Sequence, residues 1–222
     1  MVRLVSHARA LALVLLLVHS AGCATRQLVK REELGPVFAP RNVTSVSRWW
    51  PGIDRVVVLP TADASGKLPT TFAATFDQTW LRALQSSQRA EFVGLDRTLY
   101  SQITASPSPP ASTSILPHAW AERVKAATEA DAALLVDVTQ VSPYPPLILG
   151  WRLKLVHLPT GEILWAADEV FDAGDPAVAR AARRHARAGA SGRDGDAIAV
   201  LQSPSRYGNY TVDALVALLP PR

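Results

Sequence analysis

The residue with the most distinctive chemistry in this 222-residue chain is Cys23, its only cysteine. It follows an apolar run at residues 10–18 (ALALVLLLV) and the three residues Ser20, Ala21 and Gly22. The run is too short to span a bilayer as a helix and comes after a positively charged start, as in a secretory signal peptide. A lone cysteine in an exported chain has no internal disulfide partner, so its thiol needs another use. A thioether to lipid is such a use.

The string Ser20-Ala21-Gly22-Cys23 resembles the lipobox of bacterial lipoproteins, although Ser20 stands where Leu is usual. The resemblance implies a signal peptide at residues 1–22, palmitate or related acyl chains on Cys23, and stable anchoring, because several buried chains hold where one is marginal. Residue 24 is Ala and not Asp, which by resemblance to the sorting signal implies the bacterial outer membrane, with the protein lipid-anchored at its periplasmic face. The alternative is an ordinary secretory signal with a chance cysteine.

Charge argues against a nucleic-acid partner. Removal of residues 1–22 takes two of the 23 basic residues and none of the 19 acidic ones, which leaves a formal charge of +2. With Cys23 lipidated, no thiol remains for redox chemistry or for a thiolate metal site. The remaining chain is long enough for one domain with a substantial core.

The expected organisation is a signal peptide at residues 1–22, a lipidated tether at 23–50 and a single periplasmic domain at 51–222. The tether is polar and irregular but ends in Trp49 and Trp50. Two interpretations of this pair stay open. The rings are an interfacial anchor at headgroup level, or they pack onto the first strand of the domain.

Hydrophobic periodicity predicts an α/β or α+β fold, a mixed β-sheet with a C-terminal antiparallel hairpin and helices packed on it. Phe76 and Trp80 belong to an apolar helix stripe, and we expect them to pack under the sheet with Val57 and Leu135. The hairpin is indicated by two alternating runs around the turn at residues 159–161. Strands are expected at residues 55–60, 91–95, 132–141, 147–158 and 162–171, and helices at 69–84, 96–103, 119–130, 176–188 and 210–219.

Several short strings in this order of elements resemble a known group. They are VVVLP at residues 56–60, GLDR at 94–97, ADAALLV at 130–136, YPP at 144–146 and TGEILW at 160–165. The pattern resembles periplasmic lipoprotein domains related to the TolB N-terminal domain. That group includes the curli-secretion lipoprotein, the lipoprotein activator of a penicillin-binding protein and the ring-forming lipoprotein of Pel polysaccharide export. The long amphipathic hairpins of the curli-type pore have no counterpart here.

Candidate chemistry in the domain is sparse. His118, His157 and His185 are far apart and lack partners at metal-ligand spacing, so no metal site and no cofactor are expected. Gly66-Lys67 lacks the glycine pattern of a phosphate loop and is interpreted as a plain loop. Asp168 and Glu169 are neighbours on a strand and point to opposite faces. No nucleophile stands beside a base, so the chain is not expected to be an enzyme.

One charged feature remains. Arg180, Arg183, Arg184 and Arg187 follow helical spacings of three and four and crowd one face. The face is interpreted as a contact for an anionic surface, such as lipid headgroups, an acidic protein or an acidic polysaccharide. The alternative is a solvated helix neutralised by nearby acids such as Asp172 and Asp175, with His185 solvated as well.

These features favour a non-enzymatic, lipid-anchored component that assembles or docks in an envelope complex, as an export accessory or an accessory of cell-wall synthesis. A homo-oligomeric ring and a monomeric activator are both compatible with it, and the envelope protein partner is not named by the sequence. The alternative is a small-ligand carrier of the periplasm, which requires a pocket beyond the needs of the core.

Overall fold

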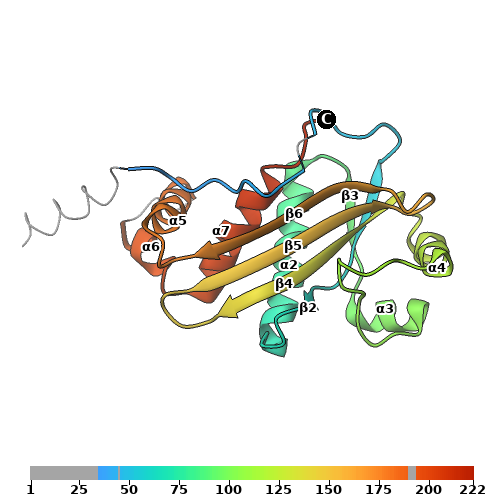
Figure 1. Cartoon of the computed structure of the whole chain (residues 1–222), viewed down its shortest axis with the longest axis horizontal. Helices are drawn as coiled ribbons and strands as arrows, with labels where there is room; N and C mark the ends of the chain where they lie inside the picture. Colours follow the sequence, from blue (N-terminus) through green and yellow to red (C-terminus); the bar gives the residue numbers. More distant parts are fainter. Residues whose placement is uncertain (1–34, 45, 190–193) are drawn as a thin grey trace, which may run out of the picture. The chain divides into compact units, whose positions relative to one another are not determined.

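The computed structural model describes residues 35–44, 46–189 and 194–222, and the unit that folds as one body comprises Phe38–Arg222. The predicted elements occur in the expected order, and a short strand at residues 62–63 and a short helix at 194–199 were not predicted (Figure 1). The strands are β1 Arg55–Val58, β2 Ala62–Asp63, β3 Glu91–Gly94, β4 Ala132–Ser142, β5 Ile148–His157 and β6 Ile163–Asp172. The helices are α2 Thr70–Ser87, α3 Arg97–Thr104, α4 His118–Thr128, α5 Pro176–Ala188, α6 Asp194–Ala199 and α7 Pro204–Val216.

The sheet is mixed, with strand order β3-β1-β4-β5-β6 and β2 paired to β4. The first three strands of this order run parallel, and β4, β5 and β6 form an antiparallel meander. The predicted C-terminal hairpin is β5–β6, with Gly161 at a positive φ in its turn. The α+β class expected from the sequence is confirmed.

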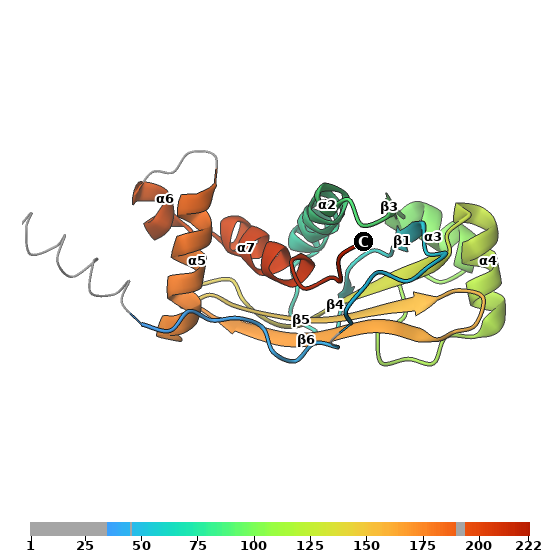
Figure 2. The same ribbon diagram turned by 90° about the horizontal axis from the view of Figure 1, so that it is seen from above.

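Helices cover the two faces of the sheet unequally. One face packs against α2, α5 and α7 in the main core, and the other packs against α3 and α4 in a smaller core over β1 and β4. In Figure 2, α2 and α7 lie side by side above the sheet, while α5 and α6 stand at one end and α3 and α4 at the other. Among the described residues, no helix covers the outer face of β5 and β6 over most of its length.

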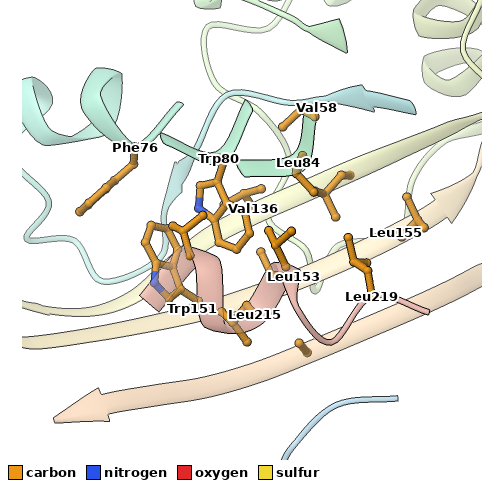
Figure 3. Close-up of a cluster of buried hydrophobic side chains, with 14 of the residues drawn as sticks. Val58, Phe76, Trp80, Leu84, Val136, Trp151, Leu153, Leu155, Leu215 and Leu219 are labelled. Carbon is orange, nitrogen blue, oxygen red and sulfur yellow. The ribbon is translucent and has the colours of Figure 1, made fainter. Parts of the chain in front are cut away.

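The main core centres on Trp151 of β5. Its ring meets Trp80 of α2 edge-on, with ring centroids 5.2 Å apart and planes at 88°, and meets Phe76 at 5.0 Å (Figure 3). Its Nε1 donates a hydrogen bond of 2.9 Å to Thr211 Oγ1 on α7. One side chain therefore joins α2, the sheet and α7.

The partners expected for Phe76 and Trp80 were wrong by one residue of register. Val57 and Leu135 lie in the smaller core under α3 and α4, whereas Val56, Val58, Leu134 and Val136 face α2. Successive strand side chains alternate between faces, and a strand buried on both faces is apolar at every position. Its sequence therefore does not indicate which helix each residue will meet.

The final helix begins earlier than expected. α7 starts at Pro204 instead of residue 210, with the Ser203 hydroxyl accepting from the N–H of Arg206 as its N-cap. Ser followed by Pro is a helix-start signal. Gly208 lies inside α7. A Cβ at this position would meet the Phe76 ring at 2.8 Å, so the glycine permits α7 to approach α2 closely.

The segment expected to be tether also differs. Residues 38–44 and 46–54, called the strap below, pack on the domain instead of hanging free. Val43 forms an antiparallel bridge with Ala167 on the edge of β6, and Trp49 is buried beside Ile53. The exposed edge of β6 offers unpaired backbone groups, which the strap satisfies. The folded unit therefore begins at Phe38 rather than at residue 51.

Replacement of Trp80 with Ala is expected to lower the free energy of unfolding by about 3–5 kcal/mol, because it empties the space over Trp151. That is a large share of the roughly 5–15 kcal/mol of an ordinary domain. Urea denaturation measures it. Leu99→Ala, at a half-exposed site on α3, is the control and should change stability by about 0.5 kcal/mol or less. A Trp80→Ala midpoint equal to that of the control would contradict the central role of this ring.

Candidate functional site

The arginine face of α5 is turned away from the core. The helix starts at Pro176, with the Asp175 carboxylate accepting from the N–H of Ala177 at 2.7 Å. Its buried residues are Val178, Ala179, Ala181 and Ala182. At 100° per residue, the four arginines fall on the side opposite the mean direction of these residues. Arg184 is exposed, the other three are half-buried, and each of the four makes an interaction, so none of them is free.

A histidine–carboxylate hydrogen bond and an ion pair hold this end of the domain together. His185 of α5 lies 2.8 Å from the Asp213 carboxylate of α7, and Arg206 of α7 lies 2.6 Å from the Asp196 carboxylate of α6. The His185 ring also stands 5.7 Å from that of Tyr210. His185 therefore links two helices, whereas the sequence suggested that its side chain is simply solvated. The pairs set α5 and α6 in place relative to α7.

The strap begins beside α5. The N–H of Phe38 donates to the carbonyl of Ala177 at 3.2 Å, and the Phe38 ring packs edge-on against Phe171 at 5.3 Å. Further along, Asn42 and Thr44 exchange main-chain hydrogen bonds of 2.8–2.9 Å with β6. The polypeptide between Cys23 and the domain thus joins the folded unit at the first turn of the arginine helix.

The two tryptophans at the end of the strap pack into the domain. Trp49 is 5 % exposed, and its ring lies edge-on to Phe92 and to Trp50. Its Nε1 donates to the carbonyl of Ile53 at 2.7 Å, and Trp50 packs against the same core. This arrangement agrees with the interpretation in which the two rings pack onto the domain. Cys23, the signal peptide at residues 1–22 and the tether up to residue 34 lie outside the described residues.

A crevice opens at the carboxyl ends of the parallel strands β1 and β3. Ligands commonly bind at this end of parallel strands in α/β sheets. The volume of the crevice is about 600 Å³, and its polar lining centres on Asp77 of α2 and Arg97 of α3. Asp77 accepts from the N–H of Thr61 at 2.6 Å and pairs with Arg97 at 3.1 Å. Arg97 also donates to the Thr61 carbonyl at 2.9 Å. These groups satisfy one another and bind the loop after β1 to both helices.

The loop that follows β2 uses its own backbone donors. The Asp63 carboxylate accepts from the N–H groups of Ser65, Gly66 and Leu68 and from the Ser65 hydroxyl. Burial raises the pKa of the Asp63 carboxyl, but these hydrogen bonds favour the carboxylate and hold that pKa below its ordinary value. The donors that a phosphate loop would turn to a ligand are engaged here, which agrees with the interpretation of Gly66 and Lys67 as a plain loop.

The loop at residues 105–117 crosses the sheet near β4 and β5 and is pinned there. Fully buried Asp137 of β4 accepts from the N–H and hydroxyl of Ser112 at 2.8 and 2.6 Å. Lys154 of β5 donates to the Ser114 carbonyl at 3.1 Å. Burial lowers the pKa of the Lys154 ammonium, against the attraction of Asp137. Next to these pins Ile115 is 95 % exposed, so the loop presents an apolar side chain from a fixed base.

The remaining sequence candidates lie apart. Asp168 accepts from Arg152 Nε at 2.7 Å, whereas Glu169 accepts from the N–H groups of Arg41 and Asn42, so the two carboxylates bind different groups. His157 bonds Thr160 in the hairpin turn. Among residues 35–44, 46–189 and 194–222, no three His, Cys, Asp or Glu side chains are grouped to hold a metal ion. Over the same described ranges, no helix is long and apolar enough to cross a membrane.

No protein-family model matches the sequence, and a search of curated proteins gives no match. Solved structures do resemble the chain. The PelC dodecamer from Paraburkholderia phytofirmans is 11% identical, with a TM-score of 0.48 over 81% of this chain and 96% of that one. The LpoB C-terminal domain from Salmonella enterica is 17% identical (TM-score 0.38; 57% and 85%), and lipoprotein GNA1162 from Neisseria meningitidis 13% (0.37; 53% and 79%).

These proteins are neighbours of the kind predicted by the resemblance to lipoproteins related to the TolB N-terminal domain, which is confirmed to that extent. With TM-scores below 0.5, they add nothing to what this chain's own residues indicate about function.

Asp137→Ala is expected to release the loop at residues 105–117, because the N–H and hydroxyl of Ser112 lose their acceptor. Amide hydrogen exchange at Ser112 should become faster, and protease cleavage in the loop should increase. Ser108→Ala is the control, since Ser108 contributes only its carbonyl to a hydrogen bond. Unchanged exchange at Ser112 in Asp137→Ala would show that the pin does not hold the loop.

Asp63→Asn should make stability less dependent on pH. The lowered folded pKa of Asp63 contributes stability at neutral pH that is lost as the pH falls through that pKa. The stability difference between parent and variant is therefore largest near neutrality and narrows below about pH 4. Urea titrations across this range measure it, with Glu122→Gln on exposed α4 as a control. A difference that stays constant with pH would rule out the carboxylate as the cause.

Proposed function

We propose that this protein is a lipid-anchored component of the bacterial envelope that acts by docking or assembly and performs no catalysis. The anchor is the acylated Cys23, and the domain lies at the periplasmic face of the outer membrane. The sequence around Cys23 supports the anchor, and Ala24 supports the choice of membrane. The attachment of the strap to the domain supports a function that depends on the distance between the domain and the membrane.

The observation that carries the proposal is the attachment of the strap to β6 and α5. Main-chain pairing at residues 42–44 and the buried Trp49 hold the segment, so only the chain up to Phe38 is tether. From Cys23 to Phe38 there are about 15 residues, which extend to at most about 50 Å. A domain held so close to a bilayer is suited to work on partners at or in that membrane.

Two exposed side chains, Ile115 and Tyr144, stand on connecting segments of the domain and are suited to binding a protein partner. Ile115 stands on the loop pinned by Asp137, and Tyr144, 78 % exposed, stands at the β4–β5 turn. Apolar residues presented from fixed positions lose little conformational entropy on binding. Two forms of the function remain, a ring of identical subunits that assists export and a monomer that activates a periplasmic synthase. The mass of the delipidated protein in solution separates them.

A small-ligand carrier is the second candidate. The crevice of about 600 Å³ at the ends of β1 and β3 falls within the range of ligand pockets. Its main polar groups, Asp77 and Arg97, are engaged with each other and with Thr61, so a ligand would have to compete with them. Copurified small molecules that are released on denaturation, and are lost in Asp77→Ala, would favour the carrier.

Cys23→Ser is expected to abolish membrane attachment without unfolding the domain, because Cys23 precedes Phe38, where the folded unit begins. The parent protein should float with vesicles in a density gradient, and mass spectrometry should find acyl chains on an N-terminal Cys23. The variant should remain soluble or accumulate as precursor. Ser20→Leu restores the usual lipobox residue and should still float. An unmodified Cys23, or a mature N-terminus elsewhere, would refute the anchor.

A further inference from the structure

Three features meet at the α5–α6 end of the domain, and each bears on how the domain is oriented. The first is the point where the tether joins the fold. Phe38 is bonded to Ala177 in the first turn of α5, so of the helices described α5 lies where the lipid-bearing segment arrives. The fully extended tether reaches about 50 Å, which is the upper limit of the distance between the bilayer and Phe38. A relaxed chain is shorter and brings α5 closer to the bilayer.

The second feature is charge. Between Pro176 and Ala188 the helix has four arginines and no acidic residue, and the arginines share the face opposite the core. Two acids of this end, Asp213 and Asp196, pair with His185 and Arg206, and Asp196 and the four arginines also make other interactions. The four guanidinium groups therefore extend from the face of α5 opposite its buried residues, and an anionic headgroup there would add to the interactions that they already make.

The third feature is an exposed aliphatic side chain. α6 packs against α5, and its Ile198 is 60 % exposed. An exposed aliphatic on a helix that packs against a basic helix brings together the two kinds of side chain that interfacial helices use at a membrane surface. Figures 1 and 2 both place α5 and α6 at the end of the domain opposite α3 and α4.

From these features we propose that the α5–α6 end faces the membrane, with the arginine face of α5 on anionic lipid headgroups and Ile198 at the boundary of the acyl region. The orientation rests on the proposed anchor at Cys23. It leaves α3, α4 and the loop carrying Ile115 directed away from the bilayer, where a periplasmic partner can reach them. A membrane is favoured over a soluble polyanion because the tether delivers α5 to the bilayer surface.

The test uses the mature lipidated protein with one introduced cysteine. Cys23 is the only native cysteine and its thiol is consumed by the lipid, so a polarity-sensitive thiol probe labels only the new site. Ile198→Cys reports the α5–α6 end. Ile115→Cys is the matched control, because Ile115 is also an exposed isoleucine and its loop connects α3 and α4, the helices at the opposite end. The protein is reconstituted in phosphatidylcholine vesicles, with or without phosphatidylglycerol, that carry a quencher on the acyl chains.

The expected result is strong quenching at position 198 and weak quenching at position 115 in the anionic vesicles. High salt and neutral vesicles should reduce the quenching at 198, because headgroup attraction is screened. Arg184→Gln with Arg187→Gln should reduce it as well, since each arginine near an anionic bilayer changes the contact equilibrium about fivefold. Arg82→Gln with Arg123→Gln, which removes the same charge from exposed sites on α2 and α4, should not.

Equal quenching at both positions, or none at 198 while the protein floats with the vesicles, overturns the orientation. Quenching at 198 that is the same in neutral vesicles and in the Arg184→Gln, Arg187→Gln variant overturns the arginine contact. Arginine-dependent retention on an immobilised acidic polysaccharide, without quenching by lipid, assigns the face to a polyanion instead. Loss of flotation together with labelling of Cys23 refutes the anchor and the orientation with it.

Discussion

The arrangement of this domain depends on one buried side chain, Trp151 of β5. Its ring contacts Trp80 and so joins the sheet to α2, and its hydrogen bond to Thr211 joins the sheet to α7. α7 then places α5 and α6 through His185–Asp213 and Arg206–Asp196. The arginine face thus takes its direction from a buried indole in the middle of the sheet, by way of α7.

The edges of the sheet explain why the N-terminal segment folds where it does. On one side, β3 is only four residues long, and the Gln85 side chain donates to the Phe92 carbonyl. On the other side, β6 is long, and its outer edge would be open to pairing with another chain. The strap at residues 42–44 occupies that edge. The same pairing that protects the sheet also decides where the tether meets the domain.

The face of the sheet opposite α2 and α7 shows a different solution to burial. Asp137 lies in the middle of β4 with no exposed surface, and the loop at residues 105–117 brings Ser112 to it. A buried carboxylate without such donors would be costly, so the loop and the strand depend on each other. The composition of this loop, rich in Pro and Ser, is typical of a mobile segment, but two of its residues are fixed by β4 and β5.

The sequence by itself determined the order of elements, the hairpin, the helical stripe of Phe76 and Trp80 and the clustering of the four arginines, because these follow from local periodicity. It also carries the motif around Cys23, whose chemistry does not depend on the fold. Only the tertiary structure decided that Val56 and not Val57 faces α2, that Trp49 is buried, that His185 pairs with Asp213 and that the strap begins beside α5. Each of these is a contact between segments far apart in the chain. Neither propensity nor spacing records which face or edge of a sheet a distant segment will cover.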